Sequence, residues 1–467
     1  MWGKKKLYKV GDIVTGNTPS TKDPANYGAE VPFIKPPELQ TNLIFSAPEM
    51  LSNKGARSAR VLPSHSIMVS CIGNLGKVAV NKVPVATNQQ INSVIPNSNV
   101  HYKFLFYVVQ SQNFRNQLES LASATTVSIV NKGNFSKVEI PDPPLPTQHR
   151  IVEKIEELFS ELDNGVENLK KAQQQLKTYR QAVLKDAFEG KLTKEWREQQ
   201  TNLPTPDELL QQVKAERKAH RQRELAKWEK EVEQWEKDGD PGRKPRKPRA
   251  PKSVSEIKND EKEDFKLPNN WLLQKIGNIC NVVRGGSPRP AGDPKYYDGN
   301  IPFLKVADLT NDESPYLSEF ENTIKEAGLN RTRMVEPKTL LLSNSGATLG
   351  VPKITNISTT FNDGIAAFLG LKEHVLLYHY YFWKSKTKYL RAINQGAAQP
   401  NLNTMIIAET KIPICSEKEM GEIVNEIESR LSVVDQLEQT NQENLQKAVA
   451  LRQSILKKAF GGELVEE

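Results

Sequence analysis

Residues 180–192 read RQAVLKDAFEGKL, and residues 452–464 repeat this stretch as RQSILKKAFGGEL. Each copy ends a segment with the apolar spacing of a long helix, and each segment follows a stretch long enough to form a domain. The chain therefore reads as two copies of one unit, a globular module followed by a long helix. A repeat this long indicates a pseudo-two-fold dimer fused into one chain, because solenoid repeats are much shorter.

The composition indicates a chain with globular parts and a basic balance. Its 467 residues include 37% hydrophobic and 26% charged residues, with room for about three domains. The net charge of +8 favours a polyanionic partner such as nucleic acid without requiring one. Cys71, Cys280 and Cys415 lie far apart, which favours free thiols in a reducing compartment over a disulfide or metal framework. We find no apolar run of membrane-spanning length and no signal peptide, and therefore expect a cytoplasmic protein.

Changes in apolar pattern divide the chain into five segments. Residues 1–147 and 267–415 are expected to form two modules of mixed α/β (α+β) class, since short apolar runs alternate with Pro, Gly and Asn. Residues 148–192 and 416–467 are expected to be long helices, each of which requires a partner helix. Residues 193–266 are a connector, which contains a charged helix from a capping box at residues 205–208 to about Lys237.

Two proline-containing stretches mark boundaries. Residues 140–146 (IPDPPLP) contain four prolines without N–H donors, so we expect a stiff exit from the first module that joins neither a ladder nor a helix. Within that module, residues 66–70 and 77–80 are expected strands, and residues 104–109 an expected buried helix. In the connector, residues 243–249 (RKPRKPR) are either a contact to DNA phosphates or a solvated spacer.

Both long helices show a heptad seam that requires a partner helix. The first begins near Thr147 or Gln148, and at 1.5 Å per residue it forms a rod of ~60 Å. Its seam positions are Ile151, Ile155, Leu158, Leu162, Leu169, Leu176 and Val183. The second opens with a capping box at residues 416–419, and its seam positions are Ile423, Ile427, Val434, Leu437, Leu451 and Ile455. Asn441 and Asn444 interrupt this second seam, and either set the helix register or lie in solvent or against another subunit.

The second module repeats the scaffold positions of the first. The pattern pairs residues 10–13 with 276–279, 32–35 with 302–305, 69–73 with 342–346, and Asn88 with Asn362. The shared positions are mostly Gly, Pro and apolar residues, whereas the residues between them differ. Two scaffolds with different loops are typical of modules that recognise two different targets.

This layout resembles the DNA-specificity subunit of Type I restriction–modification enzymes, and the resemblance covers nearly the whole chain. It rests on the duplicated G-x-I…T/S-P…P-F-x-K pattern, the exit P-L-P-x-Q-x-R-I-V at residues 144–152, and the repeated R-Q-x-[VI]-L-K-x-A-F helix ends. The second copy departs from the exit motif, because Glu422 stands where the first copy has Arg150.

The resemblance implies how such a chain works. Each module would be a target-recognition domain that reads one half of a split double-stranded DNA site. The two long helices would pack as an antiparallel coiled coil, hold the modules apart and act as a ruler. The helices would also dock two methyltransferase subunits that modify adenine N6, and added motor-nuclease subunits would cleave unmethylated DNA. Half-sites on one DNA face lie about 34 Å or a multiple apart, which suits a rigid coiled coil. S-adenosylmethionine, ATP and Mg²⁺ would bind partner subunits, and this chain would bind no cofactor.

Candidate DNA contacts are basic and amide side chains in loop segments, because Arg and Lys read guanine and Asn and Gln read adenine. In the first module they are Lys35, Arg57, Arg60, Asn74, Lys77, Asn88, Gln89 and Gln90. In the second they are Arg284, Arg289, Lys305, Arg331, Arg333, Asn344, Ser345 and Asn362. Each is alternatively a solvated surface residue, and some are expected to touch only phosphate.

We expect no catalytic or metal site in this chain. Residues 142–145 (DPPL) lack the aromatic residue of an adenine methyltransferase motif, and residues 73–77 (GNLGK) depart from the phosphate-loop spacing. The six histidines form no ligand-spaced set. Two other hypotheses remain open. An architectural coiled-coil protein would bind DNA weakly and without salt dependence, and a self-contained methyltransferase would bind S-adenosylmethionine.

Overall fold

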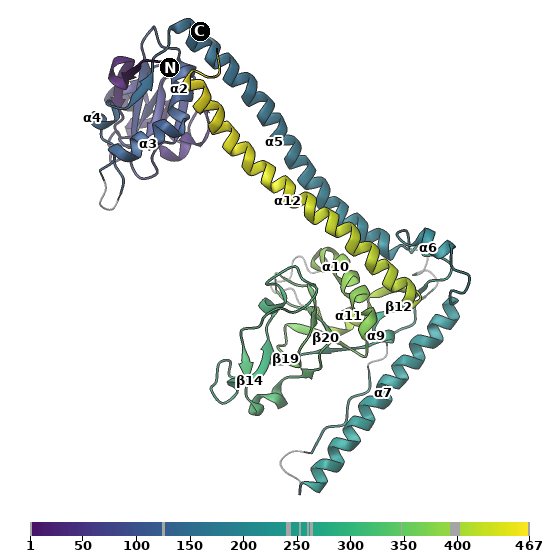
Figure 1. Ribbon diagram of the computed structural model, residues 1–467. Coiled ribbons are helices and arrows are strands. Elements are labelled where there is room, and N and C mark those ends of the chain that lie inside the picture. The colour runs from purple at the N-terminus through teal and green to yellow at the C-terminus, as the bar shows by residue number, and fades with distance from the viewer. Residues whose placement is uncertain are drawn as a thin grey trace. The chain divides into compact units, whose positions relative to one another are not determined.

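The structure, a computed structural model, describes residues 2–123, 127–239, 244–251, 254–258, 261, 265–346, 348–392 and 402–465. The chain forms two compact units (Figure 1). Unit 1 contains residues Met1–Gln173 and Gln439–Glu467, so both ends of the chain belong to it. Unit 2 contains residues Gln174–Glu438. None of the described helices is both long and apolar enough to cross a membrane.

Unit 1 is built around two main sheets. The larger has the order β2 (Gly11–Thr15), β10 (Ile91–Pro96), β7 (Ile67–Ser70), β8 (Val78–Asn81) and β4 (Leu43–Ile44). The smaller has the order β5 (Met50–Leu51), β3 (Tyr27–Ile34), β9 (Val85–Thr87) and β6 (Val61–Leu62). The helices are α1 (Asn53–Ser58), α2 (Tyr102–Gln110), α3 (Gln112–Leu121) and α4 (Lys132–Phe135). The expected strands at residues 66–70 and 77–80 and the buried helix at 104–109 are thus confirmed.

Unit 2 repeats this plan. Its first sheet has the order β13 (Asn281–Arg284), β20 (Ile365–Leu369), β17 (Thr339–Ser343) and β18 (Pro352–Thr355). Its second has the order β15 (Thr323–Ile324), β14 (Tyr297–Leu304), β19 (Thr359–Phe361) and β16 (Met334–Val335). Its helices include α6 (Lys194–Glu198), α7 (Pro206–Lys237), α9 (Ile276–Ile279), α10 (Leu376–Ala392) and α11 (Thr404–Glu409). The expected capping box forms at the start of α7, where Thr205 and Glu208 bond each other's backbone N–H groups.

The repeat extends to individual hydrogen bonds. Ser70 and Ser343 end corresponding strands, and each hydroxyl closes the loop that follows. Ser70 Oγ donates to Asn74 O at 2.6 Å and accepts from Lys77 N–H at 2.9 Å. Ser343 Oγ donates to Thr348 O at 2.7 Å and accepts from Val351 N–H at 2.8 Å. A buried serine is therefore part of the shared scaffold, because it satisfies the backbone of a tight loop.

One correspondence expected from the sequence is wrong. Residues 7–10, not 10–13, correspond to residues 276–279. Leu7 N–H donates to Val138 O and Ile276 N–H to Thr410 O, both at 3.0 Å, beside matching two-stranded ladders. Gly16 then corresponds to Gly285, and a Cβ on either would lie 2.3 Å from the carbonyl oxygen of Asn88 or Asn362. The short apolar pattern fitted both alignments, and the long-range ladders distinguish them.

The proline-rich exit from the first module also differs from expectation. Strand β11 (Glu139–Pro141) pairs with β1 (Lys4–Lys6), and helix α5 (Leu145–Phe188) begins before Pro146. Pro141 is tolerated because this sheet has only two strands, so one side of each strand needs no N–H donor. Pro146 is tolerated because a proline in the first helical turn removes no intrahelical hydrogen bond. The matching strands of unit 2 are β12 (Leu272–Lys275) and β21 (Lys411–Ile414).

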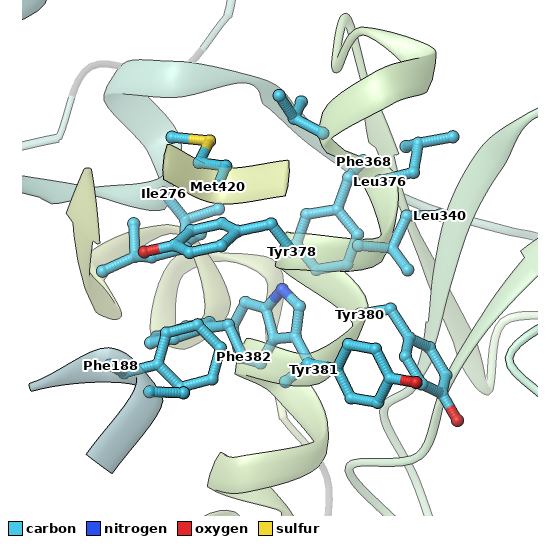
Figure 2. Close-up of a cluster of buried hydrophobic side chains, with 14 of the residues drawn as sticks. Phe188, Ile276, Leu340, Phe368, Leu376, Tyr378, Tyr380, Tyr381, Phe382 and Met420 are labelled. Atoms are coloured by element: carbon cyan, nitrogen blue, oxygen red, sulfur yellow. The ribbon is translucent and has the colours of Figure 1, made fainter. Parts of the chain in front are cut away.

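The long helices α5 and α12 (Glu417–Gly461) both run from one unit into the other. In unit 1, the start of α5 and the end of α12 join the core of the first module through Ile151, Ile155, Ile455 and Ala459. In unit 2, the end of α5 and the start of α12 join the core of the second module through Val183, Phe188, Ile423 and Ile427. Figure 2 shows Phe188 and Met420 among the aromatic side chains of α10. Each copy of the repeated stretch therefore packs against the module of the other half.

The two copies of the repeated stretch end in the same way. Gly190 and Gly462 adopt positive φ angles of 72° and 83°, the left-handed conformation that glycine favours after a helix. Lys191 N–H then donates to Asp186 O at 2.9 Å, and Glu463 N–H donates to Lys458 O at 3.0 Å. Phe188 contacts Tyr378 and Phe382 edge-on in unit 2, and Phe460 contacts Phe104 edge-on in unit 1.

The helices pair antiparallel within each unit, and most of the predicted seam positions are buried or partly buried. Ile151, Ile155, Val183, Ile423, Ile427, Val434 and Ile455 are buried, and Leu158, Leu162, Leu169 and Leu176 are partly buried. Leu437 and Leu451 were predicted on the seam, but they are 49% and 51% exposed. The adjacent Glu438 and Arg452 each form an ion pair across the helices, and Leu451 lines an open groove together with Leu162 and Leu169 of the facing helix.

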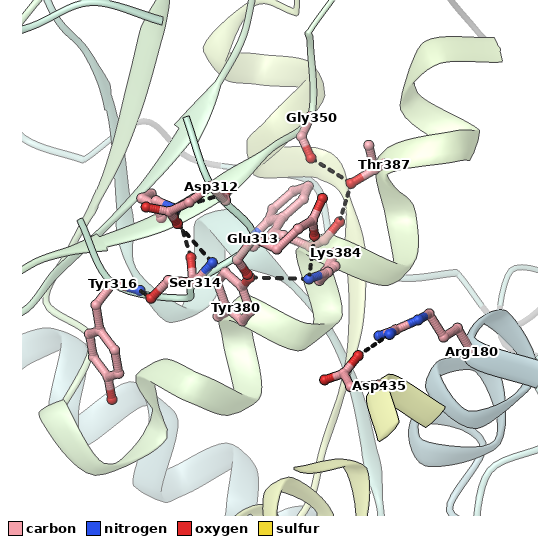
Figure 3. Close-up of polar contacts among 12 residues, drawn as sticks. Arg180, Asp312, Glu313, Ser314, Tyr316, Gly350, Tyr380, Lys384, Thr387 and Asp435 are labelled. Carbon is pink, nitrogen blue, oxygen red and sulfur yellow. Dashed lines mark hydrogen bonds and ion pairs between the residues drawn. The ribbon is translucent and has the colours of Figure 1, made fainter. Parts of the chain in front are cut away.

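These ion pairs also follow the repeat. In unit 2, Arg180 binds Asp435 and, at 2.9 Å, Glu438 (Figure 3 shows the Asp435 contact). In unit 1, Arg452 binds Asp163 at 3.3 Å and lies 4.2 Å from the ring centre of Phe159. The heptad pattern assigns the seam from apolar residues alone. It therefore could not identify Glu438 and Arg452, which pair across the helices through their charges.

Two polar residues of α12 have roles set by packing. Asn441 is buried, and its Nδ2 donates to Leu169 O of the facing helix at 2.9 Å, as expected of a residue that sets register. Asn444 is only partly buried and lines an apolar groove with Leu162, Gly165, Leu169 and Leu451. The expected capping box at residues 416–419 forms only in part. Ser416 Oγ accepts from Glu419 N–H at 3.2 Å, but the Glu419 carboxylate binds Thr193, Arg197 and Trp271 instead.

The cysteines are as expected. Cys71, Cys280 and Cys415 are buried and free. Burial raises the pKa of the Cys71 thiol to about 11 and that of Cys280 to about 12, so both are protonated at neutral pH. A protonated, buried thiol is a poor nucleophile, and these residues act as small apolar side chains of the core.

Candidate nucleic-acid interface

The candidate interface of each module begins at the ends of two neighbouring parallel strands. In unit 1, β3 pairs parallel with β9, and Lys35 and Asn88 directly follow them. In unit 2, β14 pairs parallel with β19, and Lys305 and Asn362 follow them. Asn88 N–H donates to Ile34 O at 3.0 Å and Asn362 N–H to Leu304 O at 2.9 Å. Both modules thus bring a lysine and an asparagine together at the same sheet edge.

The two lysines are held at their bases and reach solvent at their tips. The backbone N–H of Lys35 donates to Glu38 at 2.8 Å, and that of Lys305 donates to Asp308 at 2.7 Å. Lys35 Nζ binds Glu49 at 2.7 Å, while 40% of its side chain is exposed. Lys305 is exposed, and its Nζ donates to Asn322 Oδ1 at 2.7 Å. An ammonium in this setting can contact a phosphate or base edge by exchanging its present partner.

The two asparagines bend the chain at this edge. Asn88 Oδ1 accepts from Gln90 N–H at 3.1 Å, and Asn362 Oδ1 accepts from Gly364 N–H at 3.1 Å. Asn88 is also buried, and its amide donates to Gln90 Oε1 at 3.0 Å. Asparagine suits such turns because its side chain mimics a backbone carbonyl. The predicted base-reading role of these two residues competes with this turn-forming role, and the structure satisfies both side-chain oxygens internally.

In unit 1, the loops at residues 15–19 and 58–60 meet the turn at residues 88–90. Arg60 Nη1 donates to Thr15 O at 2.7 Å, and its backbone N–H donates to Asn17 Oδ1 at 2.9 Å. Thr18 Oγ1 donates to Gln89 Oε1 at 2.7 Å. Arg60 and Gln89 are exposed. The three loops therefore present cationic and amide groups together.

In unit 2, the corresponding loops gather arginines around Asp363. Arg284 Nε donates to Asp363 O at 2.5 Å, and Ser287 Oγ donates to Asp363 Oδ1 at 2.7 Å. The hydrogen bond from Ser287 holds the pKa of Asp363 below its ordinary value, and the charges of Arg284 and Arg289 act in the same direction. Arg331 stacks over Tyr296 at 5.9 Å. Arg284, Arg289 and Arg331 are exposed, so one carboxylate accompanies three cations at this surface.

Arg60 and Arg333 occupy equivalent positions in the two modules. Each directly precedes a short strand, β6 or β16, that pairs antiparallel with the strand ending beside the asparagine turn. Desolvation lowers the pKa of Arg333, and the positive charge of Arg249 lowers it further. More than a third of Arg333 is nevertheless exposed. The modules therefore share one arginine position as well as one lysine position.

The remaining predicted residues lie in a fourth loop or outside the group. Asn74 is exposed and Lys77 partly buried in the loop closed by Ser70, and Cys71 N–H joins this loop to Gln90 O at 2.8 Å. Ser345 lies in the corresponding loop, beside Gly364. Asn344 there is fully buried, and neither of its amide atoms has a hydrogen-bond partner in the described part of the chain. Arg57 is exposed on α1.

The sequence reasoning missed the residues that organise these loops. Asn17 accepts from the backbone N–H of the predicted Arg60, and Thr18 donates to the side chain of the predicted Gln89. In unit 2, Asp363 binds both Ser287 and the predicted Arg284. A usable signal was present in GNTP at residues 16–19 and GGSP at residues 285–288. Aligning these two stretches would also have corrected the pairing of residues 10–13.

The other motifs considered for chemistry have structural roles. Asp142 forms an ion pair with Lys5 at 2.6 Å beside the β1–β11 ladder. Residues 73–77 belong to the loop closed by Ser70. Within the described residues, no group of His, Cys, Asp and Glu side chains is arranged to hold a metal ion. The groups that do converge are hydrogen-bond donors and cations, which are suited to phosphates and base edges.

Comparison with known proteins agrees with this arrangement. The Type I restriction modification DNA specificity domain matches residues 1–177 and 268–447. The Type I restriction enzyme HindI specificity subunit of Haemophilus influenzae is 36% identical over 36% of this chain and 38% of its own length. The MjaIX specificity subunit of Methanocaldococcus jannaschii is 22% identical over 77% of this chain and 70% of its own length. The chain thus spans well under half of the Haemophilus relative.

Two solved structures share the fold. One is described as the structural basis of complex assembly and conformational transition of the type I R-M system. It has a TM-score of 0.64 and 19% sequence identity, and the alignment covers 99% of this chain and 98% of the solved chain. The HsdS subunit from Thermoanaerobacter tengcongensis has a TM-score of 0.56, 19% identity, and coverage of 99% and 97%. The family match covers both modules and most of the long helices α5 and α12, but not residues 178–267. This chain belongs to the family of Type I restriction–modification DNA specificity proteins.

Proposed function

We propose that this chain is the sequence-specific DNA-binding subunit of a Type I restriction–modification complex. Each module would read one half of a bipartite double-stranded site with its four-loop surface. In unit 1 this surface is formed by residues 15–19, 58–60, 71–77 and 88–90, and in unit 2 by the corresponding loops. One observation carries the proposal. Lys35 and Lys305 occupy equivalent positions in the two modules, as do Arg60 and Arg333, and both modules match the DNA specificity domain. Shared positions fit a common way of docking on the duplex, and the differing loop residues fit two different half-sites.

The partners and cofactors follow from this assignment. Two methyltransferase subunits would supply S-adenosylmethionine and modify adenine N6, and motor-nuclease subunits would supply ATP- and Mg²⁺-dependent cleavage. Val433, Leu437 and Val449 of α12 are about half exposed or more. Apolar side chains on the outside of a helix pair are candidates for burial by such subunits. This chain would contribute recognition and assembly, with the helices setting the distance between half-sites.

The first test is a genome-wide map of N6-methyladenine in the source cell, with and without this gene. We expect loss of one split motif with a fixed spacer. If every methylated motif persists, the purified chain with its methyltransferase is tested for DNA binding. Salt-insensitive, weak binding would then favour an architectural coiled-coil protein over a specificity subunit.

The second test uses the matched arginines. Arg60→Ala is expected to weaken or relax recognition of one half-site and Arg333→Ala of the other, each by about 1–3 kcal/mol if the guanidinium reads a base. Binding is measured on duplexes mutated in one half-site at a time. Lys137→Ala is the control, because Lys137 is exposed near the β1–β11 ladder. Equal effects of Arg60→Ala and Arg333→Ala on both half-sites would contradict separate readout.

A further inference from the structure

The connector places a second basic surface beside the second module. Helix α7 packs against that module through Leu209 and Val213, which are buried, and through ion pairs of Lys372 with Glu216 and of Lys227 with Glu336. The chain then returns along α7 through residues 244–251. This return segment lies between the two repeats and belongs to neither module.

The return segment is fixed to α7 by its backbone. Trp228 Nε1–H donates to Pro245 O at 3.1 Å. Arg221 donates to Pro248 O at 2.8 Å and to Arg249 O at 3.1 Å. Lys244 and Lys247 also lie over the rings of Trp235 and Trp228, at 5.5 and 5.3 Å. Arg221, Trp228 and Trp235 are seven residues apart and therefore lie on one face of α7. This face holds the extended return segment in place.

The sequence of the segment gives it two different faces. Pro245, Pro248 and Pro251 recur at every third residue, which matches the three residues per turn of a polyproline II helix. These three prolines are partly buried, whereas Lys244, Arg246, Lys247 and Arg249 are exposed. The proline face therefore lies toward α7. Lys244 contacts α7 through Trp235 and an ion pair with Glu236 at 3.2 Å, and Lys247 contacts Trp228, yet all four cations remain exposed. We name residues 244–249 the basic ribbon.

The basic ribbon approaches the candidate interface of the second module. Lys227 of α7, the neighbour of the ribbon-holding Trp228, forms an ion pair at 3.2 Å with Glu336, which directly follows β16. Desolvation lowers the pKa of Arg333, the positive charge of Arg249 lowers it further, and the negative charge of Glu224 raises it. Arg333 precedes β16 at the edge of the four-loop surface. The positive charges of Arg249 and Arg333 repel each other, and an anion bound between them would relieve that repulsion.

We propose that the basic ribbon binds the phosphate backbone of the duplex next to the half-site read by the second module, without reading bases. The proposal rests on the proposed function of that module. DNA phosphate fits better than an acidic protein, because the cations continue a surface already rich in arginine and lysine. They also lie on an extended chain already held by α7, so little conformational entropy is lost on binding.

The test compares two triple variants of the full-length chain. Arg246→Gln, Lys247→Gln and Arg249→Gln remove ribbon charges. Arg223→Gln, Lys230→Gln and Lys237→Gln are the matched control. Each control residue follows a ribbon-holding residue of α7 by two positions, which places it about 200° around the helix. Both sets change the net charge equally, and all six residues are exposed.

Duplex binding is measured between low and physiological salt, on specific and scrambled sequences. We expect the ribbon variant to bind both sequences about tenfold more weakly. The slope of log K against log salt should fall by up to about 3 units, because each lost phosphate contact removes about 0.9. The methylated motif should not change. Trp228→Ala, which keeps every ribbon charge but removes a holding contact, should give a smaller loss of affinity.

Three outcomes would overturn the proposal. Equal binding by the ribbon variant, the control and the unmodified chain would show that the ribbon does not contact DNA. Unchanged DNA binding with loss of methyltransferase co-purification would identify a protein contact instead. A change of the methylated motif would show base readout. If the unmodified chain itself bound DNA without salt dependence, the proposed function would fail first, so the two failures are distinguishable.

Discussion

At the scale of single residues, Glu419 decides how the connector meets the second long helix. Its side chain is fully buried, and its carboxylate accepts from Thr193 Oγ1 at 2.9 Å, Arg197 Nε at 2.7 Å and Trp271 Nε1 at 3.0 Å. Three segments distant in sequence therefore meet at one carboxylate. A buried charge of this kind is stable only while its hydrogen-bond partners are in place.

Glu419→Gln is expected to destabilise unit 2 by about 3 kcal/mol, because it leaves the largely buried guanidinium of Arg197 without its anion. Glu417→Gln is the control. Glu417 is 44% exposed and pairs with Lys372 and His374, so its loss should cost less than about 1 kcal/mol. Urea unfolding of the full chain measures both. Equal midpoints for the two variants would contradict the structural role of Glu419.

His379 predicts a dependence of stability on pH. Burial lowers the pKa of His379 from 6.5 to about 4, so the folded state keeps it neutral where the unfolded state would bind a proton. Stability is then full above pH 6.5 and is lost as pH falls from 6.5 toward 4, by on the order of 2–3 kcal/mol. His379→Phe should remove this slope, whereas His374→Phe, at an exposed position, should retain it. Identical slopes for His379→Phe and the unmodified chain would exclude the effect.

At the scale of elements, the repeated helix ends matter because each packs on the module of the other half. Phe188, at the end of α5, is 6% exposed and contacts Tyr378 and Phe382 of α10. Phe460, at the end of α12, is partly buried and contacts Phe104 of α2. Similar residues at both ends therefore stabilise different cores.

Phe188→Ala is expected to destabilise unit 2 by about 3 kcal/mol, through lost burial and the cavity left behind. Phe460→Ala should destabilise unit 1 by less, because Phe460 is more exposed. Hydrogen exchange separates the effects. Amides of β17 and β20 should exchange faster in Phe188→Ala, and amides of β7 and β10 in Phe460→Ala. The packing described for the two helix ends would be contradicted if Phe188→Ala increased exchange in the first module, or if Phe460→Ala increased exchange in the second.

At the scale of the whole molecule, unit 1 is assembled from both ends of the chain. Its core joins the first module and the start of α5 to Ile455, Leu456 and Ala459. A fragment of residues 1–173 should therefore leave an apolar face at Ile151 and Ile155 uncovered. Adding a peptide of residues 439–467 should restore slow hydrogen exchange in the fragment.

The control peptide carries Ile455→Ser and Leu456→Ser, which keep its length and net charge but remove the apolar contacts. It should fail to protect residues 1–173. Protection of the fragment without any peptide would show that the first module is complete on its own. Protection by both peptides would show that the contact depends on charge and not on apolar burial.

The sequence by itself determined the features that depend on local pattern. The duplication is visible in residues 180–192 and 452–464, and the capping box at residues 205–208 follows from residue types at fixed spacing. The buried seam positions Ile151, Val183, Ile423 and Ile455 follow from heptad periodicity. Lys35 and Lys305 could be chosen as candidates because the same P-F-x-K pattern places them after a strand in both copies.

Only the tertiary structure decided the features that depend on distant contacts. Leu437 is half exposed although periodicity places it on the seam, and the neighbouring Glu438 finds its partner across the helix pair. Asn88 and Asn362 fold back into turns. Glu419 binds the connector because Arg197 and Trp271 reach it through space. The two copies of the helix end have nearly the same sequence, so local pattern cannot tell which core each one completes. Long-range packing makes that choice, because each end buries its apolar face on the module that the antiparallel helix pairing brings beside it.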